Sequence, residues 1–191
     1  MAASPVFAAT PELILITGNM AAGKSSVAQA LAERLPRSVH LRGDLFRRMI
    51  VNGRAAMDAE LSVAALGQLR LRYELAAMAA RGYVEAGFTV VYQDIVIGAA
   101  LREAIGRLQG LRLAVVVLCP RAEVVAARDR DRAKTGYANP AAVQYFDHAL
   151  RTGTPRIGYW LDNSELTVAQ TVDDILAHLP DAAVAPSGAG S

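Results

Sequence analysis

The chain has 191 residues, of which 53% are hydrophobic, and its formal net charge is only +2. This length suits one α/β domain with a hydrophobic core and is too short for two domains of ordinary size. The small charge argues against a surface that coats nucleic acid, and no apolar run reaches the roughly 18 residues that span a bilayer. We therefore expect neither a nucleic acid nor a membrane as partner.

The two ends of the chain differ in composition from its centre. The first residues, MAASPVFAATPE, contain neither a basic segment nor a long apolar one, so a cytoplasmic location is expected. We predict a flexible N-terminus over 1–11, one domain over 12–180 and a disordered tail over 181–191. The single cysteine, Cys119, cannot form an internal disulfide and receives no catalytic role.

Short apolar runs alternate with helical patterns along the chain. Strands are predicted at residues 12–17, 38–41, 88–93, 112–119 and, on a weaker pattern, 156–161. Helices are predicted at 25–35, after residue 44, at 59–86 with Gly67 as a point where the helix could break, at 121–132, up to about 150 and at 168–179. Parallel strands need crossover connections, so this alternation predicts an α/β fold of three layers, a five-stranded parallel sheet with helices on both faces.

Ligands of such sheets bind at the carboxyl ends of the strands. There, a glycine-bracketed loop follows the first predicted strand and leads into a helix. Residues 18–25, GNMAAGKS, satisfy the phosphate-binding pattern GxxxxGK[ST] at every fixed position. The glycines let backbone N–H groups point at phosphate oxygens, and the following helix adds its positive end. A chance glycine-rich turn is the alternative, and the strand and helix around the loop argue against it.

The loop assigns nucleotide contacts to individual residues. Lys24 would neutralise the β- and γ-phosphates, and the Ser25 hydroxyl would supply an oxygen ligand to Mg²⁺. We therefore expect ATP and Mg²⁺ as cofactors. The predicted nucleotide-binding residues are Gly18, Asn19, Met20, Ala21, Ala22, Gly23, Lys24, Ser25 and Ser26.

A phosphate-binding loop does not by itself identify an activity. The sequence contains no NKxD-like guanine motif and is short for a helicase or a transporter. Four further segments resemble small P-loop kinases such as chloramphenicol phosphotransferase and, more distantly, shikimate, gluconate and adenylylsulfate kinases. They are GDLFR at 43–47, VVYQDIVIG at 90–98, RDRDR at 128–132 and DNSELT at 162–167. The likeness implies transfer of the γ-phosphoryl group of ATP to a hydroxyl group of a small molecule.

The resemblance also implies roles for two aspartates. Asp44 follows the second strand, where the family's carboxylate orients the acceptor hydroxyl and takes its proton; an N-cap is the alternative for this residue. Asp94 ends the third strand and is expected near the substrate or the magnesium water shell. The chloramphenicol enzyme resembles this region with two adjacent acids, whereas this chain has Gln93 before Asp94. An ordinary turn at the strand end is the alternative for Asp94.

A short lid is predicted at about 128–140, where the arginine-rich helix meets the loop KTGYANP. Arg128 and Arg132 share one helix face and are expected to contact the transferring phosphoryl group, and Arg128 also the nucleotide. An exposed ladder of ion pairs is the alternative. Thr167 either belongs to a loop that contacts the nucleotide base or caps the last helix.

The acceptor should contact the residues after Asp44 and the long helix that follows. The predicted contacts are Asp44, Phe46, Arg47, Arg48, Tyr73 and Asp94. Apolar neighbours such as Met49 favour a neutral, partly hydrophobic alcohol, for example an antibiotic or another natural product. A nucleoside or sugar kinase stays open, as do a regulatory module that binds ATP and a homo-oligomeric state.

Overall fold

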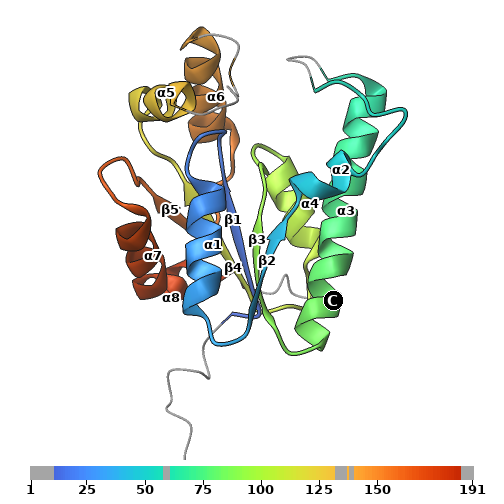
Figure 1. Cartoon of the computed structure of the whole chain (residues 1–191), viewed down its shortest axis with the longest axis vertical. Helices are drawn as coiled ribbons and strands as arrows, with labels where there is room; N and C mark the ends of the chain where they lie inside the picture. Colours follow the sequence, from blue (N-terminus) through green and yellow to red (C-terminus); the bar gives the residue numbers. More distant parts are fainter. Residues whose placement is uncertain (1–10, 58–60, 132–136, 138–139, 186–191) are drawn as a thin grey trace, which may run out of the picture.

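A parallel sheet forms the centre of the protein (Figure 1). The computed structural model describes residues 11–57, 61–131, 137 and 140–185. The strands are β1 (Leu13–Gly18), β2 (Ser38–Arg42), β3 (Thr89–Gln93), β4 (Leu113–Leu118) and β5 (Tyr159–Leu161). They form one five-stranded sheet in the order β2-β3-β1-β4-β5, with every neighbouring pair parallel. The predicted five-stranded parallel sheet is confirmed.

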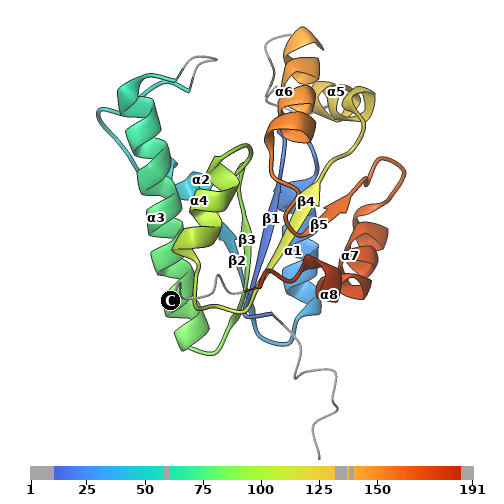
Figure 2. The same ribbon diagram turned by 180° about the vertical axis from the view of Figure 1, so that it is seen from behind.

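Helices cover both faces of this sheet (Figures 1 and 2). One layer contains α1 (Lys24–Arg34), α7 (Val168–Ala177) and α8 (Leu179–Ala182), and the other contains α3 (Val63–Glu85) and α4 (Ala100–Arg107). Alternate residues of β1 enter the two cores: Leu13 and Leu15 pack toward α3 and α4, whereas Ile14 and Ile16 pack toward α1 and α7. Burial on both faces explains why β1 and β4 read as unbroken apolar runs.

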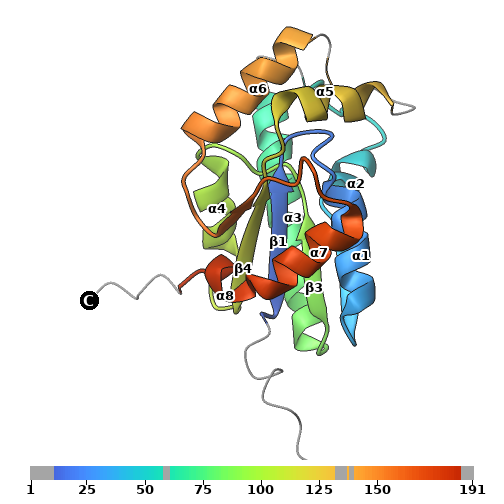
Figure 3. The same ribbon diagram turned by 90° about the vertical axis from the view of Figure 1, so that its left-hand side faces the viewer.

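Three helices lie beyond or beside the carboxyl ends of the strands. They are α2 (Asp44–Arg48), α5 (Ala122–Arg130) and α6 (Pro140–Gly153). Figure 3 shows α5 and α6 above the end of the sheet that carries the β1–α1 loop. A small core of Val125, Tyr137 and Val143 packs against Met20 and Ala21 of that loop. The lid region is thus attached to the loop through Tyr137; residues 132–136 and 138–139 of the predicted lid lie outside the described residues.

Some boundaries differ from those predicted. Helix α3 begins at Val63, after an N-cap in which the Ser62 hydroxyl accepts a hydrogen bond from the Ala65 N–H at 3.1 Å, and continues through Gly67 without a break. Residues 58–60, where the helix was expected to begin, lie outside the described residues.

The chain end also differs from its prediction. The ordered domain extends past residue 180, because α8 buries Ala182 and the Val184 N–H donates to the Leu113 carbonyl at 2.9 Å. Residues 1–10 and 186–191 of the predicted flexible ends lie outside the described residues. No helix within the described ranges combines the length and hydropathy that a membrane span needs.

Candidate active site

The β1–α1 loop has positive φ angles at two of its glycines and at Ala21. Gly18 and Gly23 have φ angles of +139° and +95°, in the region that disfavours residues with a side chain. A Cβ atom at Gly18 would lie 2.3 Å from the Leu118 carbonyl oxygen. The end of β1 can therefore lie this close to β4 only because residue 18 is glycine. Lys24 is 8% exposed, and its Nζ donates to the Asn19 carbonyl at 2.6 Å. The side chain of Lys24, the first residue of α1, therefore folds back onto the β1–α1 loop.

A cavity of about 620 Å³ opens at the carboxyl end of the sheet. Its walls come from the β1–α1 loop, the ends of β2 and β3, Arg72 of α3, Arg128 of α5 and the segment that leads into α7. Lys24 and Ser25 line one part of it, and Asp44 and Arg48 line another. The fold thus brings the predicted phosphate loop and the predicted acceptor carboxylate to one cavity.

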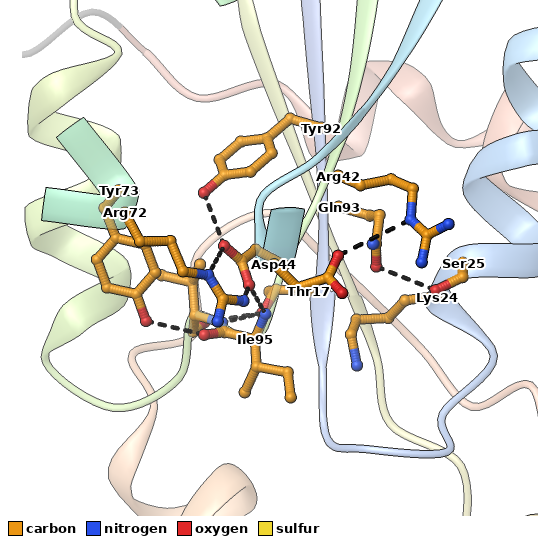
Figure 4. Close-up of polar contacts among 12 residues, drawn as sticks. Thr17, Lys24, Ser25, Arg42, Asp44, Arg72, Tyr73, Tyr92, Gln93 and Ile95 are labelled. Atoms are coloured by element: carbon orange, nitrogen blue, oxygen red, sulfur yellow. Dashed lines mark hydrogen bonds and ion pairs between the residues drawn. The ribbon is translucent and has the colours of Figure 1, made fainter. Parts of the chain in front are cut away.

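Gln93 is the β3 residue that faces Ser25. The Ser25 hydroxyl donates to the Gln93 Oε1 atom at 3.4 Å, and Gln93 is 5% exposed (Figure 4). The sequence analysis expected Asp94, and not Gln93, near the substrate or the magnesium water shell. Successive side chains of a strand point to opposite sides, so only one of two adjacent residues can face the loop. The residue that faces the loop is Gln93, whose side chain is an uncharged amide.

Asp94 is instead the centre of a buried polar cluster. Its side chain is fully buried, and both carboxylate oxygens pair with the Arg72 guanidinium, with Nε 2.8 Å from Oδ2. The Tyr92 hydroxyl donates to Oδ2 at 3.1 Å, and the Ile95 N–H donates to Oδ1 at 2.6 Å (Figure 4). Burial raises the pKa of Tyr92 far above its ordinary value, so the phenol stays protonated and can donate. With its oxygens engaged in this way, Asp94 does not fit the metal-binding role predicted for it.

Asp44 begins α2 and faces the cavity. Its carboxylate Oδ2 lies 2.7 Å from Arg48 NH2. Oδ1 lies 3.8 Å from Arg42 Nε (Figure 4). The N-cap residue of α2 is Gly43, and no side chain caps this helix, so the capping alternative for Asp44 is wrong. The sequence analysis missed Arg42; its position as the last residue of β2, directly before the glycine and aspartate, is the signal that could have indicated it.

Gly43, the residue before Asp44, packs directly against Asp94 and Tyr92. The Gly43 N–H donates to the Gln93 carbonyl at 3.1 Å. A Cβ atom at Gly43 would lie 2.0 Å from Asp94 Oδ2 and 3.0 Å from the Tyr92 ring. Only glycine therefore fits between β2 and α2, and the Asp94–Arg72 pair supports the segment that presents Asp44.

Three of the predicted acceptor contacts lie away from the cavity. Phe46 packs against the core beneath α3 and α4. Arg47 donates to the Ala55 carbonyl and so holds the following loop. Tyr73 is 5% exposed, and its hydroxyl donates to the Ile95 carbonyl at 2.9 Å. Phe46 comes two residues after Asp44 and therefore points to another side of α2, whereas Arg48, four residues after it, shares its face. Tyr73 belongs to the side of α3 that packs in the core.

Arg128 lines the cavity from α5. Its NH2 donates to the Asn163 carbonyl at 2.9 Å, which links α5 to the loop before α7. Arg132 lies outside the described residues. Thr167 caps α7, accepting from the Gln170 N–H at 3.2 Å in a complete capping box, and it also lines the cavity. The capping alternative for Thr167 is therefore confirmed, beside its place in the cavity wall.

Comparisons with known proteins agree with this architecture. The sequence profile of a family described as AAA domain matches residues 13–153. No curated protein matches the chain in sequence.

Solved structures share the fold. The tunicamycin resistance protein of Deinococcus radiodurans has a TM-score of 0.66 and 22% identity, over 93% of this chain and 100% of that one. A gluconokinase from Sinorhizobium meliloti has a TM-score of 0.64 and 21% identity, over 89% and 92% of the two chains. The Mycobacterium tuberculosis APS kinase, in complex with AMPPNP and APS, has a TM-score of 0.63 and 17% identity, over 88% and 96%. The chain therefore has the α/β fold of P-loop kinases.

Proposed function

This chain belongs to the AAA domain family, and we propose that it transfers the γ-phosphoryl group of ATP to a hydroxyl group of a small molecule. The observation that carries the proposal is the shared cavity, in which Lys24 of the phosphate loop and the carboxylate of Asp44 line different walls. Phosphoryl transfer needs a phosphate held by cations and an acceptor held in line with it. A protein that only bound or hydrolysed ATP would need no carboxylate on the acceptor side.

The nucleotide side of the cavity supplies the positive charge. The loop N–H groups and the start of α1 would bind the phosphates, and Lys24 would move from the Asn19 carbonyl to the β- and γ-phosphate oxygens. Arg128 reaches the cavity from α5 and could neutralise charge on the transferring group. These donors act from fixed positions in a partly enclosed site, where they stabilise developing charge better than water does.

The residues beside the loop fit a Mg²⁺ ion that arrives with the nucleotide. Ser25 Oγ and Gln93 Oε1 lie 3.4 Å apart, and both are oxygen donors of the kind that magnesium prefers. When bound, the ion would offset the charge of the phosphate oxygens. Because neither donor carries charge, the phosphates would have to provide most of the attraction for the metal.

The acceptor side would orient and deprotonate the attacking hydroxyl. Asp44 would accept the hydroxyl proton as the oxygen–phosphorus bond forms and the bond from the γ-phosphorus to the ADP oxygen breaks. Arg42 and Arg48 flank the carboxylate and would hold it at the cavity. Gly43 keeps Asp44 at the cavity by allowing the close contact with Asp94.

The charges at this end of the cavity favour an uncharged acceptor. Arg72 is paired with Asp94, and Arg42 and Arg48 flank Asp44, so each of these arginines already has a carboxylate partner. A strongly anionic acceptor would have to compete with those carboxylates. A neutral alcohol, such as an antibiotic, another natural product or a sugar, avoids this competition. The shared fold with a tunicamycin resistance protein and a gluconokinase is compatible with both classes.

A panel assay tests the proposal. Purified protein is incubated with Mg·ATP and a set of hydroxylated antibiotics, sugars and nucleosides, and mass spectrometry detects any compound that gains a phosphoryl group. One product that requires both ATP and Lys24 would support the proposal and identify the acceptor class. ATP binding without any phosphorylated compound would favour a regulatory module.

Replacement of Asp44 separates these two functions. Asp44→Asn should lower kcat for phosphoryl transfer by about 10²–10⁴-fold, because the amide cannot take the proton, while nucleotide binding stays close to wild type. Asp173→Asn is the matched control, since Asp173 is an exposed carboxylate on α7 that pairs with Arg34 outside the cavity. Equal turnover in the Asp44→Asn variant and the wild type would refute the assigned role.

A further inference from the structure

Helix α3 has apolar side chains on its solvent side. The helix forms one outer side of the molecule (Figures 1 and 2). Residues three or four apart share a helix face, and the outward stripe runs through Val63, Gly67, Arg70, Glu74 and Met78. Val63 is 89% exposed and Met78 is 63% exposed. The outward face of a surface helix normally carries polar side chains, so this composition calls for a physical reason.

Further apolar side chains widen the stripe. Leu66 and Leu71 stand on either side of it, at 41% and 46% exposed. Exposed apolar side chains gathered on one helix face often mark a contact with another protein. The opposite face of the same helix packs on the sheet through Tyr73 and Ala76, so the exposed stripe is not needed for the chain's own core.

Gly67 lies in the second turn of this helix, and no contact within the described chain requires a glycine there. A Cβ atom at Gly67 would meet no atom within 4 Å. Glycine inside a helix lowers stability relative to alanine, and packing within the described chain does not require it here. A glycine at this position does permit the backbone of a second helix to approach closely.

The two charged residues at the centre of the stripe indicate which molecule supplies the second helix. Arg70 and Glu74 are both exposed, and neither has an ion-pair partner within the described part of the chain. If two copies of α3 pair antiparallel about a two-fold axis level with Arg72, Arg70 of each copy faces Glu74 of the other. The same axis places Leu66 opposite Met78. A parallel pairing would place like charges together, so the stripe is complementary to itself only in the antiparallel arrangement.

We propose that the α3 stripe is the interface of a homodimer in which two α3 helices pack antiparallel. The partner is a second copy of this chain, because the surface shows the self-complementarity that a two-fold interface requires. The inference does not depend on the proposed phosphoryl transfer.

Sedimentation equilibrium over a wide range of protein concentration tests the dimer. Wild type should associate reversibly to a dimer. Arg70→Glu and Glu74→Arg should each raise the dissociation constant by roughly tenfold or more, since each creates like charges at both symmetric positions. The double variant Arg70→Glu/Glu74→Arg restores opposite charges and should regain most of the wild-type affinity.

Arg102→Glu provides the matched control, because Arg102 is an exposed arginine on α4, away from the stripe. It should leave the dissociation constant unchanged. A wild type that stays monomeric at every concentration would overturn the proposal. So would a dimer that both single reversals leave intact, or a double variant that associates no better than the single ones. Circular dichroism of each variant excludes unfolding as the cause.

Discussion

The buried pair between Arg72 and Asp94 leads to a specific prediction about stability. Its side chains are 13% and 0% exposed, so the carboxylate has no contact with solvent. Arg72→Met removes the guanidinium and leaves the Asp94 charge with only the Tyr92 hydroxyl and the Ile95 N–H as donors among the residues that the structure describes. Breaking a buried ion pair in this way costs about 3–5 kcal/mol. The free energy of unfolding should fall by that amount, a large part of the roughly 5–15 kcal/mol typical of a domain.

Urea unfolding followed by circular dichroism measures the loss. The double variant Arg72→Met/Asp94→Asn removes the unpaired buried charge and should recover about half or more of the lost stability. Arg34→Met is the matched control, because the Arg34–Asp173 pair is 53% and 61% exposed, and its loss should cost only about 0–1 kcal/mol. If Arg72→Met costs no more than Arg34→Met, or if the double variant is no more stable than Arg72→Met, the buried pair does not support the fold as argued.

Three further predictions concern the loop, the metal and pH. Lys24→Ala should abolish phosphoryl transfer while circular dichroism shows an intact fold; normal turnover in that variant would rule out the phosphate loop's assigned role. Gln93→Glu adds a charged oxygen donor beside Ser25, so it should raise the affinity for Mn²⁺ without nucleotide by roughly tenfold, as measured by electron paramagnetic resonance. A hydrogen bond to the backbone of Asp174 raises the pKa of His178 above its ordinary 6.5. Its stabilising contribution should therefore be complete at pH values below 6.5 and disappear as pH rises through the raised pKa, and His178→Gln should remove this dependence from urea unfolding curves.

Features that depend on neighbouring residues were predictable from the sequence. The loop at residues 18–25 requires glycines at fixed spacing, because the backbone conformation itself demands them. The buried strands β1 and β4 were recognisable as unbroken apolar runs. Alternation of such runs with helices predicted the parallel sheet, and the position of polar residues after the strands placed the site at their carboxyl ends.

The sequence did not predict that Gln93 would face Ser25 while Asp94 pairs with Arg72. Either residue can supply an oxygen to a metal, and the sequence favoured the charged one. The structure shows that the pleat of β3 turns Gln93 toward Ser25 and Asp94 toward Arg72, which is 22 residues away along the chain. The guanidinium lies there because α3 packs against β3, an arrangement that no local pattern encodes.

The sequence also did not predict which residues of α2 face the cavity. Asp44 and Arg48 lie at the cavity, while Phe46 and Arg47 turn to the core and to the following loop. Their rotation depends on how a helix of one turn is set against α3, since helices of this length have too few residues for a hydrophobic period to predict a face.

The sequence by itself therefore determined the phosphate loop, the sheet class and the edge of the sheet that carries the site, because backbone conformation and burial follow from residues close together in the chain. Only the tertiary structure decided which polar side chains meet at that edge. Pairing of Asp94 with Arg72 and of Gln93 with Ser25 depends on strand pleat and helix rotation. A shift of one residue in the register of β3, or of a quarter turn in α3, would exchange these partners without changing any local sequence signal.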